Sequence, residues 1–142
     1  MLDKVLLVDD EVDFLEIMEE RLSARGVDVV TSESAEDALK RIDTGIFDVV
    51  ILDLQMPGMN GLEVLKRIKA RHPEIQVILL TGHATVEKGV EAIRLGAIDF
   101  VEKPANLEVL KEKISKAHKK KMLIVEKDSR DRVIDALKKY GF

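Results

Sequence analysis

The chain has the length and composition of one ordinary globular domain. It contains 142 residues, of which 46% are hydrophobic and 35% charged, enough to build a core without disulfides. The absence of cysteine excludes a disulfide framework and thiolate metal ligands. A net charge of −4 disfavours binding to nucleic acid or to an anionic membrane surface.

The N-terminal segment predicts neither a signal peptide nor a membrane span. Only a short apolar run, Val5–Val8, precedes three consecutive acidic residues. Both a secretory signal and a membrane helix need a longer apolar stretch. We therefore expect a cytoplasmic protein that does not bind membranes.

Five short apolar runs predict the strands of a sheet. Val5–Val8, Val49–Leu52 and Val77–Leu80 are apolar at every position, which is typical of central strands covered on both faces. Val29–Thr31 is shorter and Ile98–Glu102 is interrupted by a charge, which favours the two edges of the sheet.

Helical spacing of apolar residues follows each predicted strand. The five helical patterns cover Phe14–Leu22, Ala35–Ile42, Leu62–Ile68, Val86–Leu95 and Leu107–Ile114. Ser34 and Asn106 suit helix N-caps, and Gly26, Gly45 and Gly96 follow helices where a left-handed residue is favoured. This alternation predicts an α/β fold, a doubly wound five-stranded parallel sheet with helices on both faces. Right-handed crossovers favour the flavodoxin-like strand order 2-1-3-4-5.

Polar residues follow four of the five predicted strands at one edge of this sheet. Asp9 and Asp10 follow the first strand, Asp53 the third, Thr81 the fourth and Lys103 the fifth. The strand order reverses between the first and third strands, where a ligand crevice is expected. Carboxylates brought together repel one another unless a cation or protons intervene, and an oxygen-only cluster suits Mg²⁺.

Four segments resemble the receiver domains of two-component response regulators. The segments are Asp9-Asp10, Leu52–Gly61, Leu80–Ala84 and Asp99–Pro104, in the order and at the spacing of that family. The resemblance implies a receiver domain over residues 1–116, which takes a phosphoryl group from a histidine kinase or a histidine phosphotransfer protein. Such a domain is a signalling module and catalyses only its own phosphorylation and dephosphorylation.

The resemblance also implies roles for residues of the acidic site. Asp53 is the expected phospho-acceptor, and Asp9, Asp10, Asp53 and the backbone carbonyl of Gln55 are the expected Mg²⁺ ligands. Lys103 corresponds to the lysine of the family. A carboxylate that attacks an anionic phosphoryl group needs its charge neutralised, which Mg²⁺ and the ammonium of Lys103 would do from two sides.

Further residues match positions that switch or tune receiver domains. Thr81 is the expected switch hydroxyl, and Phe100 is the expected aromatic residue that turns inward with it. Gln55 and His83 lie two residues beyond Asp53 and Thr81, where side chains influence dephosphorylation. The peptide bond before Pro104 is expected to be cis.

An alternative interpretation is a small Mg²⁺-dependent phosphohydrolase that uses the same carboxylates on an external substrate. That function needs a substrate pocket, and so short a chain offers no cap or specificity loop for one. No glycine-rich nucleotide motif follows the first strand either. We therefore favour a phosphorylation-controlled binding module.

The expected output surface consists of the fourth helix, the fifth strand and the fifth helix. Its charges are mixed, which suits a downstream protein partner or a weak self-dimer. The residues expected there are Lys88, Glu91, Arg94, Glu102 and Lys111.

Residues 117–142 are predicted to form a helical C-terminal extension or linker. They are too few for a separate DNA-binding domain, so we expect no direct contact with nucleic acid. A coiled-coil spacing runs through residues 107–124, but Lys121 and Asp128 fall on its seam. We therefore expect the fifth helix to run on and a short last helix, which ends at Gly141, to dock on the receiver, on a partner or on a second copy. The apolar residues available for docking are Met122–Val125, Val133, Ile134, Leu137 and Tyr140.

Overall fold

The computed structural model describes residues 4–82 and 85–141, and its centre is a five-stranded parallel sheet. The strands are β1 (Lys4–Val8), β2 (Asp28–Ser32), β3 (Val49–Asp53), β6 (Gln76–Thr81) and β7 (Asp99–Glu102). Their order is β2-β1-β3-β6-β7. This order confirms the predicted 2-1-3-4-5 topology and places β1 and β3 side by side at its reversal.

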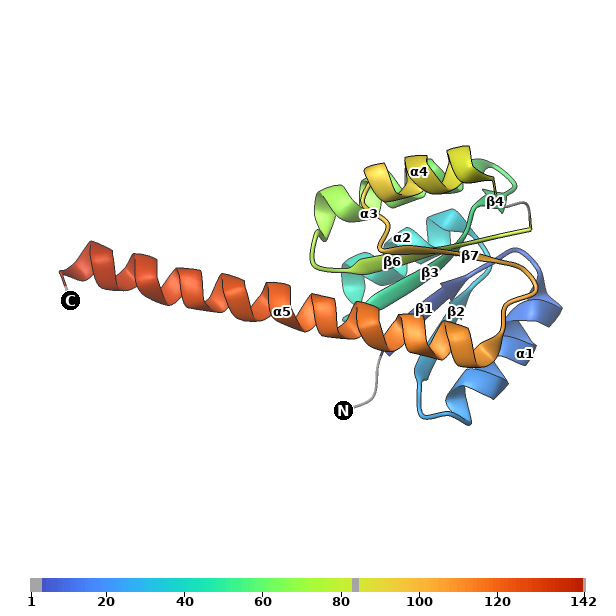
Figure 1. Cartoon of the computed structure of the whole chain (residues 1–142), viewed down its shortest axis with the longest axis horizontal. Coiled ribbons are helices and arrows are strands. Elements are labelled where there is room, and N and C mark those ends of the chain that lie inside the picture. Colours follow the sequence, from blue (N-terminus) through green and yellow to red (C-terminus); the bar gives the residue numbers. More distant parts are fainter. Residues whose placement is uncertain (1–3, 83–84, 142) are drawn as a thin grey trace.

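Five helices cover the two faces of the sheet (Figure 1). They are α1 (Val12–Ser23), α2 (Ala35–Thr44), α3 (Gly61–Arg71), α4 (Val86–Arg94) and α5 (Leu107–Tyr140). The side chains of β1 alternate between the faces: Val5 and Leu7 pack with α1 and α5, whereas Leu6 and Val8 pack with α2 and α3. The central strands are thus apolar along Val5–Val8, Val49–Leu52 and Val77–Leu80 because both faces are buried there.

Local capping accounts for several helix boundaries. The side chains of Ser34 and Asn106 accept backbone hydrogen bonds at the starts of α2 and α5, as predicted. Gly26 and Gly96 have positive φ angles, also as predicted. The prediction for Gly45 is wrong, because its φ is −116°. A Cβ atom there would lie 2.9 Å from the ring of Phe47, so close packing explains this glycine.

A small two-stranded hairpin, β4 (Gln55–Met56) and β5 (Met59–Asn60), follows β3 directly and was not predicted. Gly61 then starts α3 against the backbone of Leu54, where an added Cβ would lie 2.7 Å from Leu54 Cα. The Leu54 amide also donates a hydrogen bond to the carbonyl oxygen of Leu80 at 2.8 Å. These contacts fix the segment that leaves the end of β3.

α5 is one continuous helix of 34 residues that runs far beyond the sheet (Figure 1). Gly141 ends it in the left-handed conformation, as predicted. The predicted separate last helix and its docking on the receiver are wrong, since residues 125–141 are all exposed. Neither glycine nor proline interrupts residues 107–140, so nothing turns the chain back toward the domain. Docking on a second copy stays a prediction.

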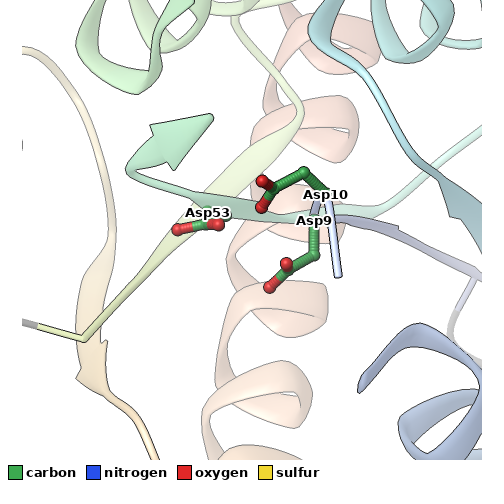
Figure 2. Close-up of side chains that lie close together, drawn as sticks. All are labelled: Asp9, Asp10 and Asp53. Atoms are coloured by element: carbon green, nitrogen blue, oxygen red, sulfur yellow. The ribbon is translucent and has the colours of Figure 1, made fainter. Parts of the chain in front are cut away.

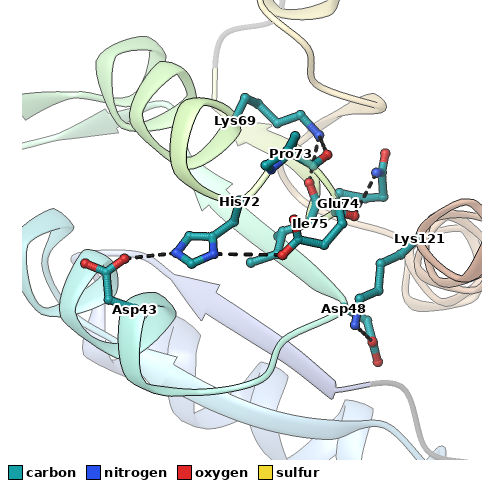
Figure 3. A network of polar contacts seen from close by, with 9 residues as sticks. Asp43, Asp48, Lys69, His72, Pro73, Glu74, Ile75 and Lys121 are labelled. Atoms are coloured by element: carbon teal, nitrogen blue, oxygen red, sulfur yellow. Dashed lines mark hydrogen bonds and ion pairs between the residues drawn. The ribbon is translucent and has the colours of Figure 1, made fainter. Parts of the chain in front are cut away.

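A buried ion pair fixes α5 to the domain where the helix leaves the sheet (Figure 3). Lys121 Nζ donates a hydrogen bond to Asp48 Oδ1 at 2.8 Å, and both side chains are buried. Nδ1 of His118 lies 3.2 Å from Asp48 Oδ2, which also accepts the backbone N–H of Lys4 at 3.0 Å. We call this group the Asp48 cluster.

Candidate functional site

Three carboxylates meet at the carboxyl ends of β1 and β3 (Figure 2). Asp53 ends β3, and Asp9 and Asp10 follow the neighbouring strand β1, whose Val8 pairs with Leu52. One carboxylate oxygen from each acid lies within 4.8 Å of the other two. Asp9 and Asp53 are buried and Asp10 is exposed, so the cluster opens to solvent on one side.

The Asp53 carboxylate is electrostatically strained in this position. Burial, with added repulsion from Asp9 and Asp10, raises the pKa of Asp53 to about 6. The Gln55 backbone N–H, which donates to Asp53 Oδ1 at 3.1 Å, and the ammonium of Lys103 oppose this rise. The three carboxylates of the cluster therefore outnumber the one ammonium beside them. A bound cation would reduce the repulsion between the carboxylates.

The donor set fits a Mg²⁺ ion. It consists of oxygen atoms only, which are the ligands that Mg²⁺ prefers, and its exposed side leaves room for water ligands. Oδ2 of Asp9 is buried and accepts no hydrogen bond. Although Lys103 Nζ lies 2.7 Å from this oxygen, the contact is a charge pair without hydrogen-bond geometry. This oxygen is therefore available to a metal.

Lys103 brings a positive charge from the end of β7. Its backbone N–H donates to the carbonyl oxygen of Thr81 at 2.7 Å, and its bond to Pro104 is cis. Its ammonium lies 2.7 Å from Asp9 Oδ2 and 3.9 Å from Asp53 Oδ2. Burial acts to lower the pKa of Lys103, but the contacts with Asp9, with Asp53 and with Glu11 raise it. The lysine is therefore held in its charged form.

Thr81 and Phe100 lie on the neighbouring strands β6 and β7. Thr81 is fully buried at the end of β6, beside β3. Phe100 is half-buried on β7 and lines an apolar groove of about 590 Å³ against α4. His83 lies outside the described residues. The other residues of this groove are Thr85, Val86, Gly89, Val90 and Ile93.

A second groove, of about 750 Å³, opens beside the acids. It is lined by Asp10, by the hairpin residues Gln55 and Asn60, and by Lys88 of α4. The structure thus brings together Asp9, Asp10, Asp53 and Lys103, with Gln55 at the rim.

Two residues near the site received no role in the sequence analysis. The Glu11 carboxylate lies 3.3 Å from Lys103 Nζ. The Phe14 ring lies under the same ammonium, with 4.6 Å between Nζ and the ring centroid. Phe14 was assigned only to the apolar face of a helix, and its place four positions after Asp10 was the one available signal.

A doubly wound parallel sheet with an acidic cluster at its reversal point is an arrangement that can hold a divalent cation in the ligand crevice of this class of fold. The family model for the response regulator receiver domain matches residues 5–115. The chain belongs to this family, whose members act in two-component signalling, interact with histidine kinases and generally bind Mg²⁺ at an acidic pocket.

The chain is similar to the receiver part of longer regulators. It is 36% identical over 132 residues to the C4-dicarboxylate transport transcriptional regulatory protein DctD of Rhizobium meliloti, covering 93% of this chain and 29% of that protein. It is 37% identical over 113 residues to the transcriptional regulatory protein ZraR of Salmonella typhimurium, covering 80% and 26%. The chain therefore spans less than a third of each relative.

Solved structures share the fold. A response regulator receiver domain from Clostridium thermocellum has a TM-score of 0.82 and 33% identity, covering 87% of this chain and 99% of that one. The BeF3-activated receiver domain of DrrB has a TM-score of 0.74 and 36% identity, covering 82% of this chain and 97% of that one.

Among the helices of residues 4–82 and 85–141, none combines the length and apolar character that a membrane crossing requires.

Proposed function

We propose that Asp53 accepts a phosphoryl group from a phosphohistidine of a kinase or a phosphotransfer protein. A carboxylate oxygen of Asp53 forms the new bond to phosphorus while the bond from phosphorus to the histidine nitrogen breaks, and the imidazole leaves. The observation that supports this assignment is the convergence of Asp9, Asp10 and Asp53 within 4.8 Å, with the ammonium of Lys103 3.9 Å from Asp53.

The residues around Asp53 each have a part in this reaction. Asp9, Asp10, Asp53 and the backbone carbonyl of Gln55 would hold Mg²⁺, which would neutralise charge on the phosphoryl group. Lys103 neutralises charge from its own side and holds the phosphoryl oxygens after transfer. Because the pKa of Asp53 is about 6, most of its carboxylate is ionised at neutral pH and can act as the nucleophile.

The product is an acyl phosphate, whose lifetime is finite and suits a timed signal. We assign the tuning of its hydrolysis to Gln55, which lines the groove beside the acids, and to His83, which lies two residues after Thr81 in the sequence and outside the described residues. Turnover is limited to the domain's own phosphoryl group, so the chain is a signalling module rather than an enzyme for external substrates.

The signal leaves through the surface formed by α4, β7 and α5. The hydroxyl of Thr81 donates a hydrogen bond to a phosphoryl oxygen, which moves the end of β6 and lets Phe100 turn inward. Beside Phe100, Val86, Val90 and Ile93 expose 82%, 52% and 52% of their surface, so this face suits an apolar partner surface. The partner is a downstream protein or a second copy of this chain.

Both curated relatives are transcriptional regulatory proteins. We assign this receiver to the control of transcription through its protein partner, without contact between residues 1–142 and nucleic acid. The net charge of −4 supports that separation of roles.

The test is incubation with Mg²⁺ and acetyl phosphate, followed by intact mass measurement. One added phosphoryl group that hydroxylamine removes supports the proposal, and Asp53→Asn should not be labelled, because an amide cannot form the acyl phosphate. Undiminished labelling of that variant would refute the assignment. Sustained turnover of phosphomonoesters without a stable adduct would instead favour the phosphohydrolase.

A further inference from the structure

Phe14 is an aromatic residue of α1 that contacts the lysine of the acidic site. The ammonium of Lys103 lies over its ring, 4.6 Å from the centroid, which is within the range of a cation–π interaction. The ring is half-buried and packs against the apolar cluster between the sheet and the helices α1 and α5. Its position is therefore fixed by the domain core and not by the site.

The other contacts of the Lys103 ammonium differ in distance and in exposure to solvent. Asp9 Oδ2 lies at 2.7 Å, Glu11 Oε1 at 3.3 Å and Asp53 Oδ2 at 3.9 Å. The side chain of Glu11 is 66% exposed, so water and salt screen its contribution. Asp53 is shielded from solvent as well, but it is the proposed phospho-acceptor, so the contacts that remain besides the reacting group and the exposed Glu11 are Asp9 and the half-buried ring of Phe14.

These two partners respond differently when the site is loaded. Asp9 is also an expected metal ligand, and a carboxylate that ligates a dication attracts a neighbouring ammonium less strongly. The ring contact uses no carboxylate and is not weakened in this way. A cation over a ring face also has no single required hydrogen-bond direction, so the ammonium can shift from Asp9 toward Asp53 without leaving the ring.

We propose that Phe14 is a positioning residue, whose ring face holds the Lys103 ammonium beside Asp53 and thereby sets the rate of phosphoryl transfer. The inference rests on the proposed function, because that function gives Lys103 its task. Leucine at this position would fill much of the same space but would offer no negative ring face. A comparison of phenylalanine with leucine at position 14 therefore separates the electrostatic role of the ring from its packing role.

The test replaces Phe14 by phenylalanines with one, two and three ring fluorines, which weaken the negative ring face at nearly constant shape. The initial rate of phosphorylation by acetyl phosphate should fall stepwise, by about three- to tenfold over the series. Phe14→Leu should show a similar fall, and Phe14→Tyr should retain the rate. Melting temperatures should stay constant along the fluorinated series, since packing is preserved.

Phe47 provides the matched control. It is buried, and its ring lies 5.5 Å from the ammonium of Lys4, which starts β1 at the opposite end of the sheet from the acids. The same fluorinated series at Phe47 should leave the phosphorylation rate unchanged. Equal falls at both positions would mean that fluorination acts through general packing, which would overturn the inference.

A second readout keeps the inference separate from the proposed function. Ring currents of Phe14 should shift the NMR signals of the Lys103 ε-methylene protons upfield, and Phe14→Leu should abolish that shift. Absence of the shift in the wild type would overturn the inference directly. Failure of the wild type to accept a phosphoryl group would overturn the proposed function. If the wild type is phosphorylated but fluorination of Phe14 leaves the phosphorylation rate unchanged, only the role of Phe14 is overturned.

Discussion

The Asp48 cluster predicts a large effect from a substitution far from the acidic site. Lys121→Met removes the ammonium that donates to Asp48 Oδ1 at 2.8 Å and keeps most of the aliphatic stem. Asp48 exposes only 7% of its surface, so water cannot replace the lost partner fully. The variant therefore leaves a buried carboxylate that is only partly paired.

The size of the effect follows from the contacts that remain. Removal of one partner from a buried ion pair costs about 3–5 kcal/mol. Asp48 keeps the backbone N–H of Lys4 at 3.0 Å and the ring of His118 at 3.2 Å, so we expect the lower part of that range or less, about 2–3 kcal/mol. At about 3–4 °C per kcal/mol for a domain of this size, the melting temperature should fall by roughly 6–12 °C.

The effect should also depend on pH. Burial acts to raise the pKa of Asp48, but the hydrogen bond from Lys121, that from the Lys4 backbone and nearby charges hold it below 3.8. A depressed pKa stabilises the fold above the unfolded value, and this contribution is lost as the pH falls through the folded value. The difference between wild type and Lys121→Met should therefore be largest near neutral pH and should shrink below pH 4.

Scanning calorimetry of the full chain measures this change without relying on the signal of the long helix. Lys119→Met is the matched control, because Lys119 lies on the same helix but is exposed and should change the melting temperature by less than about 2 °C. A fall of less than about 2 °C for Lys121→Met at neutral pH would refute the reasoning.

Three further predictions concern the acids and the extension. Asp10→Asn should weaken Mg²⁺ binding by about tenfold or more while stabilising the metal-free domain, because it removes both a ligand and a repulsive charge; unchanged affinity in calorimetric titration would contradict the site. Because burial raises the pKa of Asp53 to about 6, the folded state binds more protons than the unfolded one between pH 3.8 and 6, and stability from this group falls as pH rises. Asp53→Asn should thus melt higher than wild type at pH 7 in EDTA and show little difference near pH 4. Val133→Gln with Leu137→Gln should convert a dimer to a monomer in light scattering, since both side chains are exposed on α5; a monomeric wild type would rule out docking on a second copy.

Much of the fold and of the site was predictable, because both depend on local apolar patterns and on the rule that parallel strands are joined by right-handed crossovers. β-branched runs identified the strands, and parallel strands align their carboxyl ends. Once the strand order was known, Asp9 and Asp53 had to lie side by side, and Lys103 had to lie at the same edge of the sheet. The unbroken α5 was also open to prediction, because the sequence from Leu107 to Tyr140 contains no residue that ends a helix.

The contact between Phe14 and Lys103 was not predictable in the same way. It depends on how α1 is placed against the loop after β7, and no periodicity encodes that placement. Lys121 was misleading for a related reason. In the sequence it interrupts an apolar seam, whereas its partner Asp48 lies 73 residues earlier in the chain. Contacts between residues so far apart in the sequence are determined by tertiary packing.

Asp48 and Asp53 show why residue type alone could not separate a structural acid from a functional one. Asp48 precedes the central strand β3 and Asp53 ends it, and both are almost fully buried, with 7% and 4% exposure. Burial acts to raise both pKa values, yet that of Asp48 is lowered and that of Asp53 is raised to about 6. The difference lies in the neighbours, since Asp48 is paired with the ammonium of Lys121 at 2.8 Å, whereas Asp53 has two acids, Asp9 and Asp10, beside it and the ammonium of Lys103 only at 3.9 Å. A buried acid whose charge is balanced holds the fold together, whereas one whose charge is left in excess is ready to bind a cation and to react.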